Sequence, residues 1–154
     1  ESLDLQRILA EMRAAAVTHV VLEVSSHALD LHRVDHCAFD VGVFTNFSQD
    51  HLDYHKTMAS YWTSKRKLFV ELLPKGPKSA RAVAVVNTDD PRGTELMQLE
   101  NLRRISVGID PSNDVRPERQ QQDLSGFQGR LHTPLGPLAL RSPFLAVSRA
   151  SGSA

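Results

Sequence analysis

The chain has 154 residues, of which 41% are hydrophobic and 23% are charged, as in an ordinary globular domain. Its 18 basic and 18 acidic residues balance, so no net charge favours binding to nucleic acid or to an anionic membrane surface. No apolar run approaches the roughly 20 residues that a membrane-spanning helix needs, and the single cysteine, Cys37, fits a reducing cytoplasm.

Helical periodicity and β-branched runs alternate along the chain. Apolar residues at helical spacing predict helices at 3–16 and 57–73. A single helical turn is predicted at 27–31, and a further helix is predicted to start at Pro91. Short runs rich in valine, isoleucine and phenylalanine predict strands at 19–24, 39–44, 82–86 and 105–108. This alternation predicts an α/β fold in which helices flank a mostly parallel sheet.

The sequence changes character near its C-terminal end. Residues 110–123 are polar and predict a loop, whereas 124–131 and 138–141 predict an antiparallel hairpin. We expect this hairpin to form an antiparallel edge on the same domain.

Both ends of the sequence look cut. The chain begins with Glu1 rather than Met, and its last residues are small and polar. We therefore expect a fragment of a longer protein, with one incomplete domain at 1–145 and a disordered or aberrant tail at 146–154.

Two of the predicted strands end in clusters of polar side chains. The first runs into Glu23 and a Ser-Ser-His sequence, and the second into a segment that carries Asp50 and His51. Ligands of open α/β sheets bind just beyond the carboxyl ends of the strands, so these two ends are expected to form one site. The Glu23 carboxylate is a candidate ligand for Mg²⁺, which prefers oxygen ligands. A carboxylate that simply faces water at the strand edge is the alternative.

Three nearby patterns have competing interpretations. His51 and His55 are four residues apart and could bind zinc on a helix, but a His-Glu-x-x-His motif and a cysteine cluster are both missing. The serines before His27 could belong to a hydrolase, yet the Gly-x-Ser-x-Gly turn is missing, so we interpret them as donors to a substrate anion. Lys65, taken alone, indicates a solvated helix face.

The third strand is also followed by polar residues, which are Asn87, Asp89 and Asp90. Taken alone they are turn and cap residues that precede a helix starting at Pro91. Together with the other two strand ends they could hold a ribose or a metal-bound water. We therefore predict that they bind nucleotide.

Five sequence blocks occur together in one order. They are Glu23-Val24-Ser25-Ser26-His27-Ala28-Leu29, Arg33-Val34, Phe44-Thr45-Asn46, Asp50-His51-Leu52-Asp53-Tyr54-His55 and Tyr61-x-x-x-Lys65-x-x-Leu68-Phe69. Together they resemble the Mur ligase family, and the likeness continues through 86–91 and the hairpin. Within the family, the blocks are similar to the enzymes that add the third peptide residue to UDP-N-acetylmuramoyl-L-alanyl-D-glutamate.

The resemblance implies an ATP-dependent amide ligase of peptidoglycan precursor synthesis. The D-glutamyl side-chain carboxylate of the substrate would attack the γ-phosphate of ATP, and the amine of meso-diaminopimelate or L-lysine would then displace phosphate from the acyl phosphate. Mg²⁺ would be the cofactor, because it offsets the charge on the phosphoryl oxygens. The implied partners are ATP, the UDP-linked dipeptide and the diamino acid, and we expect a monomer.

The resemblance also implies roles for individual residues. Glu23 and His51 would hold one Mg²⁺, and a carbamylated Lys65 would bind the second. Carbamylation converts the lysine cation into an anion with two oxygens that can ligate a metal. The residues implied to contact the UDP-muramoyl substrate are Ser25, Arg33 and Asn46.

The sequence departs from the family pattern in three places. The Gly-x-x-x-x-Gly-Lys-Ser/Thr phosphate loop is absent, and in the family it lies upstream of the position of Glu1. Leu31 stands where some relatives have glutamine, and residues 146–150 break the expected pattern. We therefore expect the chain alone to be inactive. A non-catalytic remnant and a histidine-based metallohydrolase are the alternatives.

Overall fold

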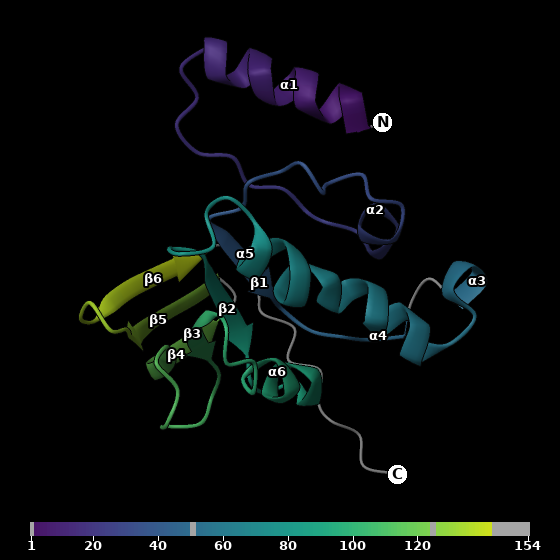
Figure 1. Ribbon diagram of the computed structural model, residues 1–154. Coiled ribbons are helices and arrows are strands. Elements are labelled where there is room, and N and C mark those ends of the chain that lie inside the picture. Colours follow the sequence, from purple (N-terminus) through teal and green to yellow (C-terminus); the bar gives the residue numbers. More distant parts are fainter. Residues whose placement is uncertain (1, 50–51, 124–125, 143–154) are drawn as a thin grey trace.

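The computed structural model describes residues 2–49, 52–123 and 126–142, and Figure 1 shows how they are arranged. A parallel sheet with helices on one side adjoins a separate antiparallel sheet, and the first helix, α1, lies apart from both sheets. The predicted metal ligand His51 and the predicted tail lie outside the described residues. The expected domain boundary at residue 145 therefore stays a prediction.

The parallel sheet confirms three of the four predicted strands. β1 (Val41–Phe44), β2 (Val83–Asn87) and β3 (Arg103–Val107) lie in the order β1-β2-β3, and neighbouring strands run parallel. The three carboxyl ends therefore lie at one edge of the sheet. This is the edge at which the sequence predicts a site.

A continuous helical run covers one face of the parallel sheet (Figure 1). It consists of α4 (Met58–Lys67), the π-helical turn η1 (Leu68–Leu72) and α5 (Leu73–Lys75), and it confirms the helix predicted at 57–73. The run ends at Lys75, two residues past its predicted end, and it includes Pro74 in its last turn.

The core lies between this helical run and the sheet. Val86 of β2 is completely buried, and Leu73 of α5 is 1% exposed. Gly42 of β1 allows the helix to approach, because a Cβ at this position would lie only 2.6 Å from Cδ1 of Leu73. The other core residues on these elements include Phe44, Trp62, Leu68, Phe69 and Ala84.

The second sheet is antiparallel and consists of β4 (Arg116–Asp123), β5 (Gly126–His132) and β6 (Leu138–Ser142), in that order. The predicted hairpin is confirmed as β5 and β6. The predicted loop at 110–123 is wrong, because more than half of it forms β4. The polar side chains of this strand give no apolar alternation, and it forms because its backbone pairs with β5.

The strand predicted at 19–24 is also wrong. α1 (Ser2–Ala14) forms close to its predicted range, but residues 17–25 contain no regular secondary structure. Val21 is fully exposed, and Val20 is 49% exposed. No described strand pairs with this segment, so its backbone gains no ladder hydrogen bonds. Of its valines, Val24 is half-buried and packs against the core.

Three short helices complete the described fold: α2 (Ser26–Asp30), α3 (Leu52–His55) and α6 (Pro91–Leu96). α2 confirms the predicted helical turn. α6 begins at the predicted proline, and Asp90 caps it by accepting a hydrogen bond from the backbone N–H of Arg92 at 2.8 Å. Across the described ranges, no helix is long and apolar enough to cross a membrane.

Candidate functional site

The carboxyl ends of the three parallel strands are joined by the turn after β2. Asn87 Nδ2 donates a hydrogen bond to the carbonyl oxygen of Thr45, after β1, at 2.6 Å. On the other side, Asp89 Oδ1 accepts a hydrogen bond from the backbone N–H of Ile109, after β3, at 3.0 Å. One turn therefore holds both neighbouring strand ends in place.

Asp90 attaches the loop after β1 and the start of α6 to the same edge. Its Oδ2 accepts a hydrogen bond from the backbone N–H of Phe47 at 2.7 Å. Gly93 lets α6 lie close to β2, since a Cβ there would lie 1.8 Å from the carbonyl oxygen of Asn87. The structure thus brings the three predicted nucleotide-binding residues together, and the contacts they make within the chain are those of turn and cap residues.

A cavity of about 510 Å³ borders this edge, between the parallel sheet and the strands β4 and β5. Asn87 and Asp89 line it together with Arg116, so hydrogen-bonding groups stand beside it. Apolar residues supply much of the remaining wall, among them Val43, Val85, Val107, Ile109 and Val115. An apolar cavity with a few polar groups is typical of small-molecule sites.

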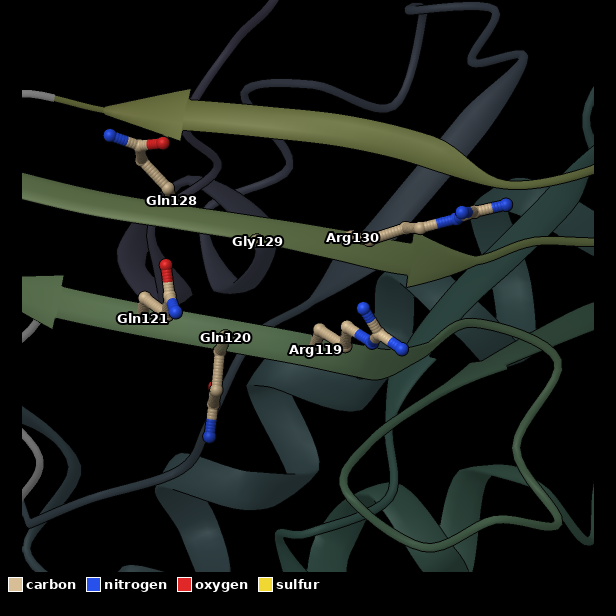
Figure 2. A pocket seen from close by; sticks show the side chains of 6 residues that line it. All are labelled: Arg119, Gln120, Gln121, Gln128, Gly129 and Arg130. Atoms are coloured by element: carbon tan, nitrogen blue, oxygen red, sulfur yellow. The ribbon is translucent and has the colours of Figure 1, made fainter.

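A second hollow, of about 470 Å³, lies on the antiparallel sheet, and Figure 2 shows the side chains around it. Arg119 and Gln121 of β4 face Gln128 and Arg130 of β5 across it. No predicted site residue lines this hollow. We therefore place the candidate site at the edge of the parallel sheet.

Lys65 reaches the segment that carries Glu23. Its Nζ donates to the backbone carbonyl of Val24 at 3.4 Å, although the two residues are 41 positions apart. Lys65 is half-buried on α4, whereas Glu23 is exposed near the end of 17–25. Lys65 therefore contacts the residue next to Glu23, and the third predicted metal ligand, His51, lies outside the described residues. In the described part of the chain, no three His, Cys, Asp or Glu side chains gather closely enough to hold a metal ion.

The residues implied to contact the UDP-muramoyl substrate lie on two segments. Ser25 and Arg33 flank α2, and Asn46 is exposed on the loop after β1. Ser25 caps α2, because its Oγ accepts a hydrogen bond from a backbone N–H at 3.1 Å. A hydrogen bond to Asp30 raises the pKa of the Tyr54 phenol, and the nearby charge of Arg33 partly offsets this rise.

Two buried residues that the sequence analysis considered in separate patterns form a hydrogen-bonded pair that it did not predict. Ser26 Oγ lies 2.8 Å from His55 Nε2, and the two residues are 0% and 5% exposed. The partner considered for a hydrolase was His27, whereas this serine bonds to a histidine 29 positions away. A completely buried hydroxyl is not positioned to attack a substrate. No local sequence pattern indicates that His55 pairs with Ser26, because the two residues are far apart in the chain.

These features define an α/β domain whose polar strand ends meet at one edge of a parallel sheet. The model of the Mur ligase middle domain matches residues 1–151, so the chain belongs to this family. The resemblance seen in the sequence blocks is confirmed.

The curated relatives agree with this assignment. The chain is 47% identical over 145 residues to the UDP-N-acetylmuramoyl-L-alanyl-D-glutamate–2,6-diaminopimelate ligase of Geobacter metallireducens. It is 44% identical over 146 residues to the protein of the same name from Geobacter sulfurreducens. Each comparison covers 94% of this chain but only 28% of the relative.

Solved structures show the same fold. A ligase with the same name as these relatives superimposes with a TM-score of 0.80 at 27% identity, covering 94% of this chain and 29% of that one. The UDP-N-acetylmuramoylalanyl-D-glutamyl-2,6-diaminopimelate–D-alanyl-D-alanyl ligase of Acinetobacter baumannii has a TM-score of 0.57 at 20% identity, covering 75% and 24%. The chain thus spans less than a third of the length of the proteins it matches.

Proposed function

We propose that this chain is part of an ATP-dependent ligase that joins 2,6-diaminopimelate to UDP-N-acetylmuramoyl-L-alanyl-D-glutamate. The observation that carries the proposal is the 47% identity, over 94% of the chain, to a relative of that name. Because the relatives are named for 2,6-diaminopimelate, we propose this amino acid rather than L-lysine. The whole enzyme would act as a cytoplasmic monomer in peptidoglycan precursor synthesis.

In the proposed reaction, the D-glutamyl side-chain carboxylate attacks the γ-phosphorus of ATP, and ADP leaves. The amine of 2,6-diaminopimelate then attacks the acyl carbon of the resulting acyl phosphate. Phosphate leaves, the amine loses a proton, and the amide bond is complete. Negative charge gathers on the phosphoryl oxygens in the first step and on the leaving phosphate in the second, so the site needs positive charge nearby.

The residues near the end of 17–25 fit a bound Mg²⁺ ion. Glu23 offers an exposed carboxylate, and Lys65 reaches the neighbouring residue. A lysine ammonium would repel the ion, but a carbamate, formed when the amine attacks carbon dioxide and loses a proton, offers two anionic oxygens. We propose Glu23, His51 and carbamylated Lys65 as the metal ligands. When bound, Mg²⁺ would offset the charge on the phosphoryl oxygens.

We also propose that the cavity beside β2 receives the nucleoside of ATP. Its apolar wall suits the base, and Asn87 and Asp89 can meet the ribose hydroxyls. The third proposed nucleotide-binding residue, Asp90, follows Asp89 in the same turn and accepts a hydrogen bond from the backbone N–H of Phe47. The proposed contacts of the UDP-muramoyl substrate are Ser25, Arg33 and Asn46.

The proposal can be tested on the longer ligase that contains this chain. With ¹³C-bicarbonate and Mg²⁺ supplied, the wild type should show one carbamate carbon resonance, and Lys65→Arg should lose both that resonance and the ligation of 2,6-diaminopimelate. Lys75→Arg, the same change on α5, is the matched control and should keep both. We expect the ligation rate of Lys65→Arg to fall on the order of 10²-fold or more, because the change removes a group that acts mainly in the transition state.

Two outcomes would contradict parts of the proposal. A fully active wild type without a carbamate signal would exclude carbamylation while leaving the ligase assignment intact. A longer protein that binds the UDP-linked dipeptide but never ligates an amino acid would favour the non-catalytic alternative.

A further inference from the structure

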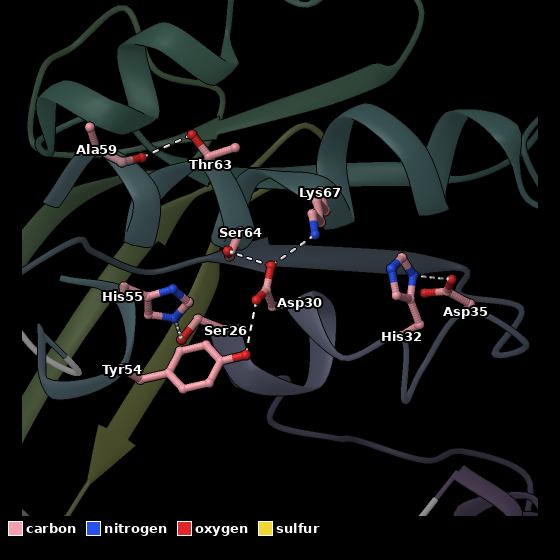
Figure 3. A network of polar contacts seen from close by, with 10 residues as sticks. All are labelled: Ser26, Asp30, His32, Asp35, Tyr54, His55, Ala59, Thr63, Ser64 and Lys67. Carbon is pink, nitrogen blue, oxygen red and sulfur yellow. Dashed lines mark hydrogen bonds and ion pairs between the residues drawn. The ribbon is translucent and has the colours of Figure 1, made fainter. Parts of the chain in front are cut away.

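α2 is joined to α3 by two side-chain hydrogen bonds, one at each end of the helix (Figure 3). At its start, Ser26 Oγ lies 2.8 Å from His55 Nε2. At its end, Asp30 Oδ2 accepts a hydrogen bond from the hydroxyl of Tyr54 at 3.0 Å. Two adjacent residues of α3 therefore hold both ends of one helical turn, and α2 cannot shift along α3 without breaking one of these bonds.

Asp30 also joins α2 to α4. Its Oδ1 accepts hydrogen bonds from Ser64 Oγ at 3.2 Å and from Lys67 Nζ at 3.1 Å (Figure 3). The bond from Lys67, followed by that from Tyr54, lowers the pKa of the Asp30 carboxyl group, so the charged form is the one these donors stabilise. One carboxylate thus receives donors from two other helices.

The Ser26–His55 pair lies in the interior and has aromatic neighbours. The ring of His55 stacks on Tyr61 of α4 at a centroid distance of 5.3 Å and meets Tyr54 edge-on at 4.7 Å. Ser26 is completely buried. In a buried setting a hydrogen bond is strong, and removing one partner costs the desolvation of the other. The pair therefore fixes one relative position of α2, α3 and α4.

We propose that Ser26, His55 and Asp30 are positioning residues of the ligase site. They hold the start of α2 against α3 and its end against α3 and α4, and this determines where the preceding segment presents Glu23 relative to Lys65. The inference rests on the proposed function, because a positioning role presupposes a reaction at these two residues. It assigns no chemical step to the three residues, which act by fixing the helices that flank the site.

The connectivity supports this assignment. Glu23 lies three positions before Ser26, in a segment that no described strand pairs with. Its position therefore depends on how α2 is held and on the hydrogen bond from Lys65 to Val24. A group displaced by about 1 Å from its reacting partner can cost on the order of 10²-fold in rate.

The test compares Ser26→Ala, His55→Phe and the double variant in the longer ligase. His55→Phe keeps an aromatic ring beside Tyr61 but removes Nε2. We expect kcat to fall about 10-fold to 100-fold in each single variant, with smaller changes in KM for ATP. The double variant should be no slower than the slower single variant, because both remove the same bond.

Two further variants separate positioning from general stability. His55→Gln can place an amide where Nε2 lies and should recover much of the lost kcat. Thr63→Val removes a hydroxyl that bonds to the carbonyl of Ala59 on the exposed side of α4, and it should behave as wild type.

Amide hydrogen exchange provides a readout that does not depend on activity. In Ser26→Ala, exchange should become faster over 23–31 and stay unchanged in β2, because a positioning bond acts locally. Wild-type kcat in both single variants, additive losses in the double variant, or equally faster exchange in β2 would each overturn the inference. A wild-type ligase without ligation activity would instead contradict the proposed function, and the exchange result would still report on the Ser26–His55 coupling.

Discussion

β2 and the segment 17–25 have similar sequences and different structures. Both contain a run of valines, and the sequence predicts a strand in each. β2 pairs with a strand on both sides, and Val86 is completely buried. In the segment 17–25, Val21 is fully exposed and no described strand lies alongside.

The difference shows that a β-branched run becomes a strand only when other parts of the chain supply hydrogen-bonding partners and cover. β2 receives its ladder partners from residues that are 20 or more positions away in the sequence, and helices pack over its buried face. The segment 17–25 is held mainly at its end, through the Lys65 bond to Val24 and the attachment of α2. We test this contrast with three predictions about stability, ordered from the largest expected effect to the smallest.

The largest effect is expected in the centre of β2. Val86→Asp would place a carboxylate in an apolar core, and an unpaired buried charge typically costs about 3–5 kcal/mol. We expect the variant to lose most of its cooperative unfolding transition in urea, followed by circular dichroism. Val86→Ile, which keeps an apolar side chain, is the control. A Val86→Asp protein with wild-type stability would show that β2 is not the centre of the core.

The sequence predicted those features that depend on nearby residues. The start of α6 follows from Asp90 followed by proline, and β2 follows from a short apolar run that is buried on the helix-covered face. The meeting of the ends of β1, β2 and β3 also followed, because parallel strands put their carboxyl ends at one edge. The end of 17–25 was expected there as a further strand end, and that part of the prediction was wrong.

The remaining features depend on tertiary contacts that local patterns do not encode. Apart from Pro117, β4 has a polar sequence, and it exists because β5 pairs with it. The pairing of Ser26 with His55 and the contact of Lys65 with the end of 17–25 join residues 29 and 41 positions apart. For the predicted ligands, sequence patterns could name Glu23 and Lys65 but could not show what fixes their positions.

A moderate, pH-dependent effect is expected where α2 anchors the end of 17–25. The bonds from Lys67 and Tyr54 lower the pKa of Asp30 in the folded chain. A carboxyl group with a lowered folded pKa stabilises the fold at pH values above its ordinary pKa of about 3.9, and this contribution is lost as the pH falls through the lowered folded value.

The difference in unfolding free energy between wild type and Asp30→Asn should therefore be largest near neutral pH. It should shrink as the pH falls below about 4. Comparing the two proteins at each pH cancels the contributions of other carboxyl groups, such as Asp40, whose pKa is lowered by Lys78. A difference that stays constant from pH 7 to acid would show that the charge of Asp30 does not stabilise the anchor.

The smallest effect is expected for the substitution in 17–25 that matches the one in β2. Val21→Asp changes a fully exposed side chain, and surface substitutions usually alter the unfolding free energy by less than about 0.5 kcal/mol. The segment has no described ladder partner, so an aspartate there disrupts no strand pairing and faces water. Urea unfolding of this chain should therefore have the same midpoint in Val21→Asp as in wild type, under the conditions in which Val86→Asp fails to fold. If Val21→Asp instead lowers the midpoint as strongly as a core substitution does, the segment is paired and covered in solution. The strand that the sequence predicts at 19–24 would then be correct, and the contrast with β2 would disappear.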